Sequence, residues 1–136
     1  MQQPICKDQL ILRQPGRPAT LADAPLAQNL MDTLIFNQDR CVGMAANMIG
    51  QPVNIIAVKT GPLQLLMLNP IITKQSQPYQ TTEGCLSLLG ERPTKRFEQI
   101  TVQYQDLTGQ TQTLPATGFL AQIIQHEVDH CHGIII

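Results

Sequence analysis

The residues best suited to chemistry lie near the end of the chain, where His126, Glu127 and His130 form an HExxH pattern. On a helix, side chains four residues apart project from the same face, so both imidazoles can bind one divalent ion at about 2.0–2.1 Å. Glu127 lies beside them, where it can take a proton from a water molecule at the ion. The pattern predicts a catalytic metal site, although two such histidines are also found as polar surface residues of ordinary helices.

A catalytic site of this type needs a third protein ligand. The residues after His130 offer Cys131 and His132, but both point away from the helix face that carries the histidine pair. We therefore expect the ligand from upstream, and Cys85 is the best candidate because a thiolate binds zinc or ferrous iron strongly. Taken alone, this cysteine is more typical of a small buried apolar residue.

Two helices and a group of strands are expected to position these residues. Thr20 and Asp23 form a capping pair before apolar residues at three- and four-residue spacing, which predicts a helix over residues 20–37. An apolar stripe predicts a second helix over 118–131, and residues 4–19 are expected to be a loop. Runs of branched apolar residues predict at least partly antiparallel strands at 54–59, 63–73, 100–106 and 111–114. This order indicates an α+β fold, with antiparallel or mixed β-sheets packed around the C-terminal HExxH helix and an N-terminal helix.

Composition limits the classes of function. A chain of 136 residues suits one cored domain, so residues 1–136 are expected to form a single domain. Nine basic and ten acidic residues are scattered along it, which disfavours a direct nucleic-acid reader or a membrane-bound protein. The chain has neither a signal-type start nor a run of roughly 18 apolar residues. We therefore expect a cytoplasmic protein whose four cysteines are thiols rather than disulfides.

Three motifs together resemble the peptide deformylase family, whose members remove the formyl group from the N-terminal methionine of new bacterial or organellar proteins. The motifs are Gly-hydrophobic-Ala-Ala at Gly43–Ala46, Glu-Gly-Cys-Leu-Ser at Glu83–Ser87 and Gln-His-Glu-x-Asp-His at Gln125–His130. The small residues of the first motif would also let another group approach the backbone closely. Residues Leu68–Pro70, Arg96, Asp106 and Gly109 are similar to family positions too, so the resemblance covers nearly the whole chain.

The resemblance implies a metal centre and two catalytic roles. Cys85, His126 and His130 would bind one divalent ion, iron(II) or a substitute such as zinc or nickel. Glu127 would act as general acid and base, and the backbone N–H of Leu86 would donate to the oxygen that becomes negatively charged. The implied partners are N-formylmethionyl peptides, met near the ribosomal exit of the nascent chain.

One wall of the implied substrate site departs from the family pattern. By position, the substrate contacts are expected to be Val42, Gly43, Met48, Phe119, Gln122 and Ile123. The family has a glutamine at Met48, and losing one such oxyanion donor typically costs on the order of 10² to 10³ in turnover. Asn47 would replace the donor if the backbone were shifted by one residue.

Three functions follow from these residues. The leading one is a metal-dependent hydrolase that removes the N-formyl group from the formylmethionine of nascent polypeptides, with activity reduced by Met48. The alternative is a weakened, deformylase-like metal-binding protein that binds formylated or processed peptide N-termini. A metallopeptidase that cleaves internal peptide bonds is disfavoured by the motif at Glu83–Ser87 and by the lack of a downstream ligand.

Overall fold

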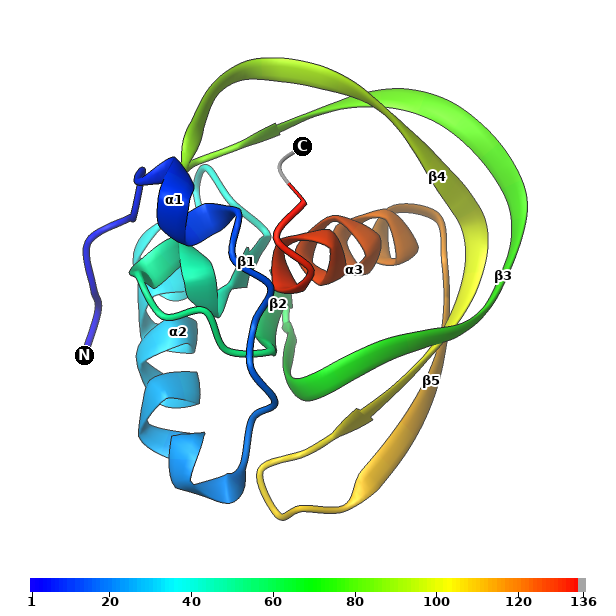
Figure 1. The fold of residues 1–136 in the computed structure, drawn as a ribbon. Coiled ribbons are helices and arrows are strands. Elements are labelled where there is room, and N and C mark those ends of the chain that lie inside the picture. The colour runs from blue at the N-terminus through cyan, green and yellow to red at the C-terminus, as the bar shows by residue number, and fades with distance from the viewer. Residues whose placement is uncertain (135–136) are drawn as a thin grey trace.

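The fold is built on one antiparallel sheet whose five strands lie in the order of the chain (Figure 1). The computed structural model describes residues 1–134. Its strands are β1 (Gly43–Ala45), β2 (Ile55–Thr60), β3 (Leu63–Cys85), β4 (Leu88–Gln105) and β5 (Thr111–Thr117). Its helices are α1 (Gln9–Leu12), α2 (Ala24–Phe36) and α3 (Gly118–Cys131), with 3₁₀ turns η1 (Leu21–Asp23) and η2 (Ala46–Ile49). The expected α+β class is confirmed, and the sheet is wholly antiparallel.

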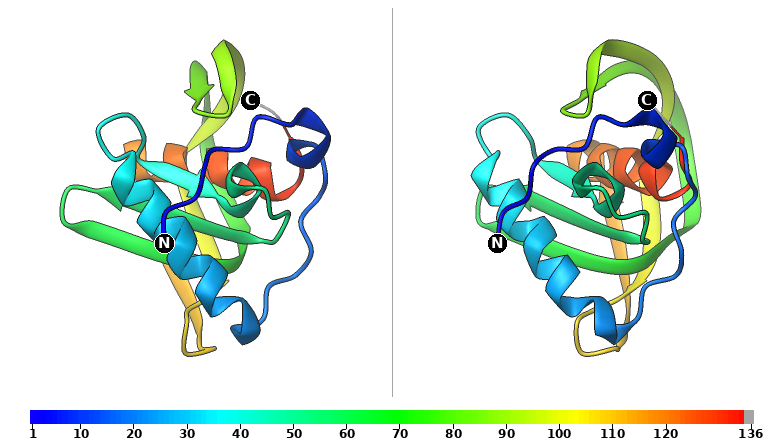
Figure 2. Two further views of the ribbon diagram at one scale, coloured as in Figure 1. Left: turned by 90° about the vertical axis from the view of Figure 1, so that its left-hand side faces the viewer. Right: turned by 60° about the vertical axis from the view of Figure 1, so that its left-hand side comes forward.

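Strands β3 and β4 form a long curved ribbon that wraps around α3, as the views in Figures 1 and 2 agree. Irregular register between Leu68 and Ile71, between Ile72 and Lys74, and at Gly84 bends this ribbon. The predicted strands at 63–73 and 100–106 were therefore too short. The intervening residues are mostly polar and exposed, so they carry no alternating apolar pattern from which a strand could be predicted.

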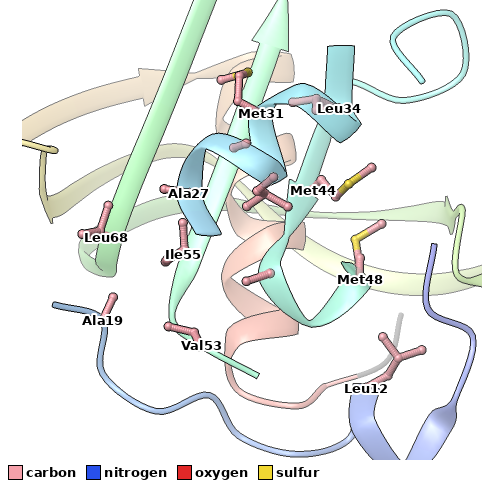
Figure 3. Packing of buried hydrophobic residues seen from close by; sticks show 13 residues of the cluster. Leu12, Ala19, Ala27, Met31, Leu34, Met44, Met48, Val53, Ile55 and Leu68 are labelled. Atoms are coloured by element: carbon pink, nitrogen blue, oxygen red, sulfur yellow. The ribbon is translucent and has the colours of Figure 1, made fainter. Parts of the chain in front are cut away.

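The sheet is packed between α2 and α3. Strand β2 is buried on both faces because its side chains alternate between two apolar clusters. Ile55 and Ala57 join the cluster under α2, which also contains Met44 and Met48 (Figure 3). Ile56 and Val58 join the cluster under α3. This packing fixes α3 and the segment after β1 against the same strand, and so places the two parts of the predicted site side by side.

The helix boundaries follow local capping. Thr20 and Asp23 form the expected capping box, although it starts the short η1 turn before α2 begins at Ala24. The expected loop over 4–19 is interrupted by α1, which Asp8 caps by accepting a hydrogen bond from the N–H of Leu10. Helix α3 has its predicted bounds. None of the helices within residues 1–134 combines the length and apolar character needed to cross a membrane.

Candidate metal centre

The three predicted ligands come together where the end of β3 meets α3. Donor atoms of Cys85, His126 and His130 all lie within 4.8 Å of one another. The Sγ of Cys85 is 3.4 Å from Nε2 of His130, close to the separation of about 3.6 Å that sulfur and nitrogen ligands of one tetrahedral ion have. A thiolate and two imidazoles suit zinc or ferrous iron. The cluster therefore fits the single divalent ion expected from the sequence.

The imidazole of His126 is oriented by a carboxylate. Its Nδ1 lies 2.8 Å from Oε1 of Glu83, so Nδ1 donates and Nε2 is left for a metal ion. Burial lowers the pKa of His126, but Glu127, Cys85 and Glu83 outweigh it and raise that pKa to about 10 in the protein without metal. Metal binding at Nε2 must therefore displace a proton. Burial lowers the pKa of His130 to about 3, so this ligand is already neutral.

Glu83 is itself held by a buried ion pair. Arg96 on β4 donates from Nη2 and Nε to the two carboxylate oxygens at 2.7 and 2.9 Å, and from Nη1 to Asp129 on α3 at 2.7 Å. The side chains of Glu83 and Arg96 are only 6% and 5% exposed. Burial raises the pKa of Glu83, but hydrogen bonds from His126, Arg96 and Gln122 lower it to about 2. The carboxylate is thus charged and correctly placed before any ion binds.

Glu127 faces the same space from the next position on α3. It is buried, its Oε1 has no hydrogen-bond partner among the described residues, and burial raises its pKa to about 7. An unpaired buried carboxyl group is costly, and one that titrates near neutrality can accept and return a proton. Gly43 makes room for it, because a Cβ there would lie 2.9 Å from Oε2 of Glu127 and 2.6 Å from Cγ2 of Ile123. The close approach expected of this small-residue segment is confirmed.

A cavity of about 480 Å³ opens beside these residues. Its lining includes Cys85, His126 and Glu127, together with Leu86. It also includes all six expected substrate contacts: Val42, Gly43, Met48, Phe119, Gln122 and Ile123. The structure therefore brings the whole predicted set to one place, while the role of each residue toward a substrate stays a prediction.

Two neighbouring residues, Asn47 and Met48, have different surroundings. Met48 is 1% exposed, and its Sδ lies 3.5 Å from the backbone N of Ala45. Asn47 Nδ2 donates instead to the carbonyls of Leu12 and His130, at 3.3 and 3.0 Å. The alternative in which a shifted backbone lets Asn47 supply the missing donor is therefore not realised, because its amide ties α1 to α3.

Four residues of the site were not assigned their observed roles from the sequence. Glu83 and Arg96 were noted only as motif positions, and Gln122 only as a substrate contact. Asp129 was noted only as the aspartate of the motif at Gln125–His130. Each acts through a partner distant in the chain, such as the Glu83–Arg96 pair 13 residues apart across β3 and β4.

Comparison with known proteins identifies the family. The family model for polypeptide deformylase matches residues 3–136. The chain belongs to the polypeptide deformylase family. It is 48% identical over 136 residues to a peptide deformylase of Clostridium beijerinckii, with 100% of both chains covered. It is 40% identical over 112 residues to a peptide deformylase of Dictyoglomus thermophilum, covering 82% of this chain and 72% of that one.

Solved structures of the family have the same fold. The peptide deformylase of Thermus thermophilus superimposes with a TM-score of 0.88 at 32% identity, covering 99% of this chain and 84% of that one. A Met-Ala-Ser-bound peptide deformylase of Acinetobacter baumannii gives a TM-score of 0.88 at 29% identity, covering 99% and 97%. The expected function, a hydrolase that removes N-formyl groups from nascent polypeptides, is thus confirmed at the level of the family. Peptide deformylases bind a catalytic metal ion, which agrees with the cluster at Cys85.

Proposed function

We propose that this protein deformylates N-formylmethionyl peptides at one divalent ion held by Cys85, His126 and His130, with iron(II) as the native ion and zinc or nickel as substitutes. The observation that carries the proposal is the convergence of three donor atoms within 4.8 Å, two of them from Cys85 and His126, which line the same cavity as Glu127. Three protein ligands leave a coordination position for water or substrate, as catalytic sites require.

A bound ion would supply Lewis-acid chemistry, polarising the formyl carbonyl and making a water molecule more acidic. The residues of the chain carry out the proton transfers. Glu127 takes a proton from the attacking water molecule as the water oxygen bonds to the formyl carbon. It then delivers that proton to the nitrogen as the C–N bond breaks, which releases formate and a free amine. Burial raises the pKa of the Glu127 carboxyl above its ordinary value in the metal-free protein, which favours a role as proton acceptor.

The remaining roles concern binding of the substrate. The backbone N–H of Leu86 donates to the carbonyl oxygen as negative charge develops on it. The methionine side chain lies in the apolar part of the cavity, against Val42, Phe119 and Ile123. Gly43 lets β1 pack directly against Glu127, because a Cβ there would lie 2.9 Å from Oε2 of this carboxylate. Because the substrate is the N-terminus of a nascent chain, we also propose that the protein acts in the cytoplasm near the ribosomal exit.

The test is release of formate from formyl-Met-Ala-Ser by anaerobically purified protein loaded with ferrous iron. Air must be excluded because a thiolate such as Cys85 oxidises readily, and its oxidation would destroy the site. Acetyl-Met-Ala-Ser is the matched control, since the added methyl group hinders attack at the same amide. Equal amounts of formate and free amine support the proposal, and the same assay with zinc or nickel ranks the metals.

Met48 favours a second candidate, a metal-holding protein that binds formylated or processed peptide ends without turning them over. Absence of formate from protein that carries one equivalent of iron, together with saturable binding of the formyl peptide, would support this second function. Absence of bound metal would contradict both.

A further inference from the structure

One hydrogen bond at the metal centre is not used by the proposed mechanism. Nε2 of Gln122 donates to Oε2 of Glu83 at 2.9 Å. Gln122 lies four residues before His126 on α3, so the two side chains share a helix face and reach the same carboxylate. His126 contacts Oε1 and Gln122 contacts Oε2. Helix α3 therefore binds Glu83 at two points, one on each oxygen.

The polarity of this bond is fixed by its partner. Glu83 forms a two-point ion pair with Arg96, at 2.7 and 2.9 Å, and a carboxylate ionised in this way can only accept. The amide of Gln122 must therefore turn its nitrogen toward Glu83, whichever way the rest of the cavity would orient it. A hydrogen bond to a charged acceptor is also stronger than one between neutral groups.

The bond completes the set of donors around Glu83. Arg96 donates once to each oxygen from β4, at 2.7 Å to Oε1 and 2.9 Å to Oε2. Each oxygen thus accepts two hydrogen bonds, which matches the roughly four acceptor positions of a carboxylate. Without Gln122, His126 would be the one described residue of α3 that bonds this carboxylate directly, because Arg96 reaches α3 through Asp129. The plane of the carboxylate could then turn about the Arg96 pair, and the direction offered to Nδ1 of His126 would change.

We propose that Gln122 is a positioning residue of the metal centre: by holding Oε2 of Glu83, it fixes the orientation of His126 and raises the affinity of the site for its ion. The inference rests on the proposed metal site. Gln122 also lines the cavity, so one side chain connects the substrate pocket to a metal ligand. Outer-shell partners that touch a ligand directly are typically worth about 10–100-fold in metal affinity, and a residue one step further out should be worth less.

The test measures binding of cobalt(II) to the metal-free protein in competition with a chelating dye, together with the visible absorption of the bound cobalt. Gln122→Met keeps the length of the side chain but removes the donor, whereas Gln122→Arg keeps a donor. Gln28→Met is the matched control, because Gln28 also donates from Nε2 to a carboxylate at 2.9 Å, but on the exposed face of α2. Thermal unfolding checks each variant, and Gln122→Leu replaces the methionine variant if that one does not fold.

We expect Gln122→Met to weaken cobalt binding by about three- to tenfold and to shift its absorption bands, with Gln122→Arg and Gln28→Met within about twofold of the wild type. Wild-type affinity and spectrum in Gln122→Met would overturn the inference. An equal loss in Gln122→Arg would overturn it as well, because packing rather than the donor would then be responsible. If the wild type itself binds no cobalt, the proposed metal site fails, and the inference fails with it.

Discussion

The two walls of the cavity are held in different ways. On the α3 wall, His126 and Glu83 belong to a polar network in which Arg96 and Gln122 satisfy the buried carboxylate. On the wall formed by β1 and η2, Met48 is buried among apolar side chains (Figure 3), and its side-chain sulfur lies 3.5 Å from the backbone nitrogen of Ala45. The α3 wall orients reacting groups through hydrogen bonds. The wall of β1 and η2 determines the shape of the cavity through apolar packing. Substitutions on the two walls should therefore change activity in different ways.

The largest effect is expected at Glu127 on the polar wall. Glu127→Ala removes the group that accepts and returns the proton, so turnover should fall by about 10²–10⁴. The variant should still bind one equivalent of metal, because Glu127 is not among the three clustered donors. Formate release and metal content measured on the same sample give the result. Glu98→Ala, which removes an exposed carboxylate from β4, is the control. Equal rates in the wild type and Glu127→Ala would exclude Glu127 as the base.

The next largest effect is expected on the apolar wall, where a substitution should raise turnover rather than lower it. Met48→Gln has nearly the same length and supplies an N–H to the oxygen that becomes negatively charged. Turnover should rise by on the order of 10² to 10³ if the missing donor limits the reaction. Met48→Leu, which adds no donor, should leave the rate near that of the wild type. An unchanged kcat in Met48→Gln would mean that another group stabilises this charge. The apolar wall would then not limit turnover.

A smaller loss of turnover is expected from a substitution at Gly43, where β1 packs against α3. In Gly43→Ala the new Cβ would lie 2.9 Å from Oε2 of Glu127, so either the carboxylate or β1 must move. A misplacement of about 1 Å can cost about 10²-fold in turnover, and overpacking costs typically about 1–3 kcal/mol in stability. Formate release and the midpoint of urea unfolding separate these two costs. Full activity in Gly43→Ala would show that Glu127 has more freedom than this contact implies.

The difference between the two walls also explains which features could be predicted from the sequence. The metal ligands His126 and His130 were found because their spacing within one helix is local information. Cys85 was the best upstream thiolate, and its match to a family motif agreed with that choice. The close approach at Gly43 was anticipated from its small neighbours. These predictions depend on residues that are near one another in the chain or on whole motifs.

The remaining features depend on contacts that spacing does not encode. The polar middle of the β3–β4 ribbon has no apolar periodicity, so its strands were missed between residues 74 and 99. The same ribbon brings Glu83 and Arg96 to α3, and its curvature arises from register shifts that only the folded sheet reveals. The position of the Asn47 side chain could not be predicted from the sequence, and in the fold two carbonyl acceptors from α1 and α3 hold its amide.

The smallest effect on the working enzyme is the pH dependence of stability, because it appears only below about pH 4.5. The pKa of Glu83 is about 2 in the folded protein, against an ordinary value of 4.5. Its charged form therefore stabilises the fold fully above about pH 4.5, and this contribution is lost as the pH falls toward 2. In metal-free protein, the difference in free energy of unfolding between the wild type and Glu83→Gln should be a few kcal/mol at pH 6 and should shrink steadily below pH 4.5. Urea unfolding at several pH values measures it. A difference that stays constant down to pH 2.5 would mean that the Glu83 carboxylate keeps no special partner in the fold, and the polar wall would then be held by packing as the apolar wall is.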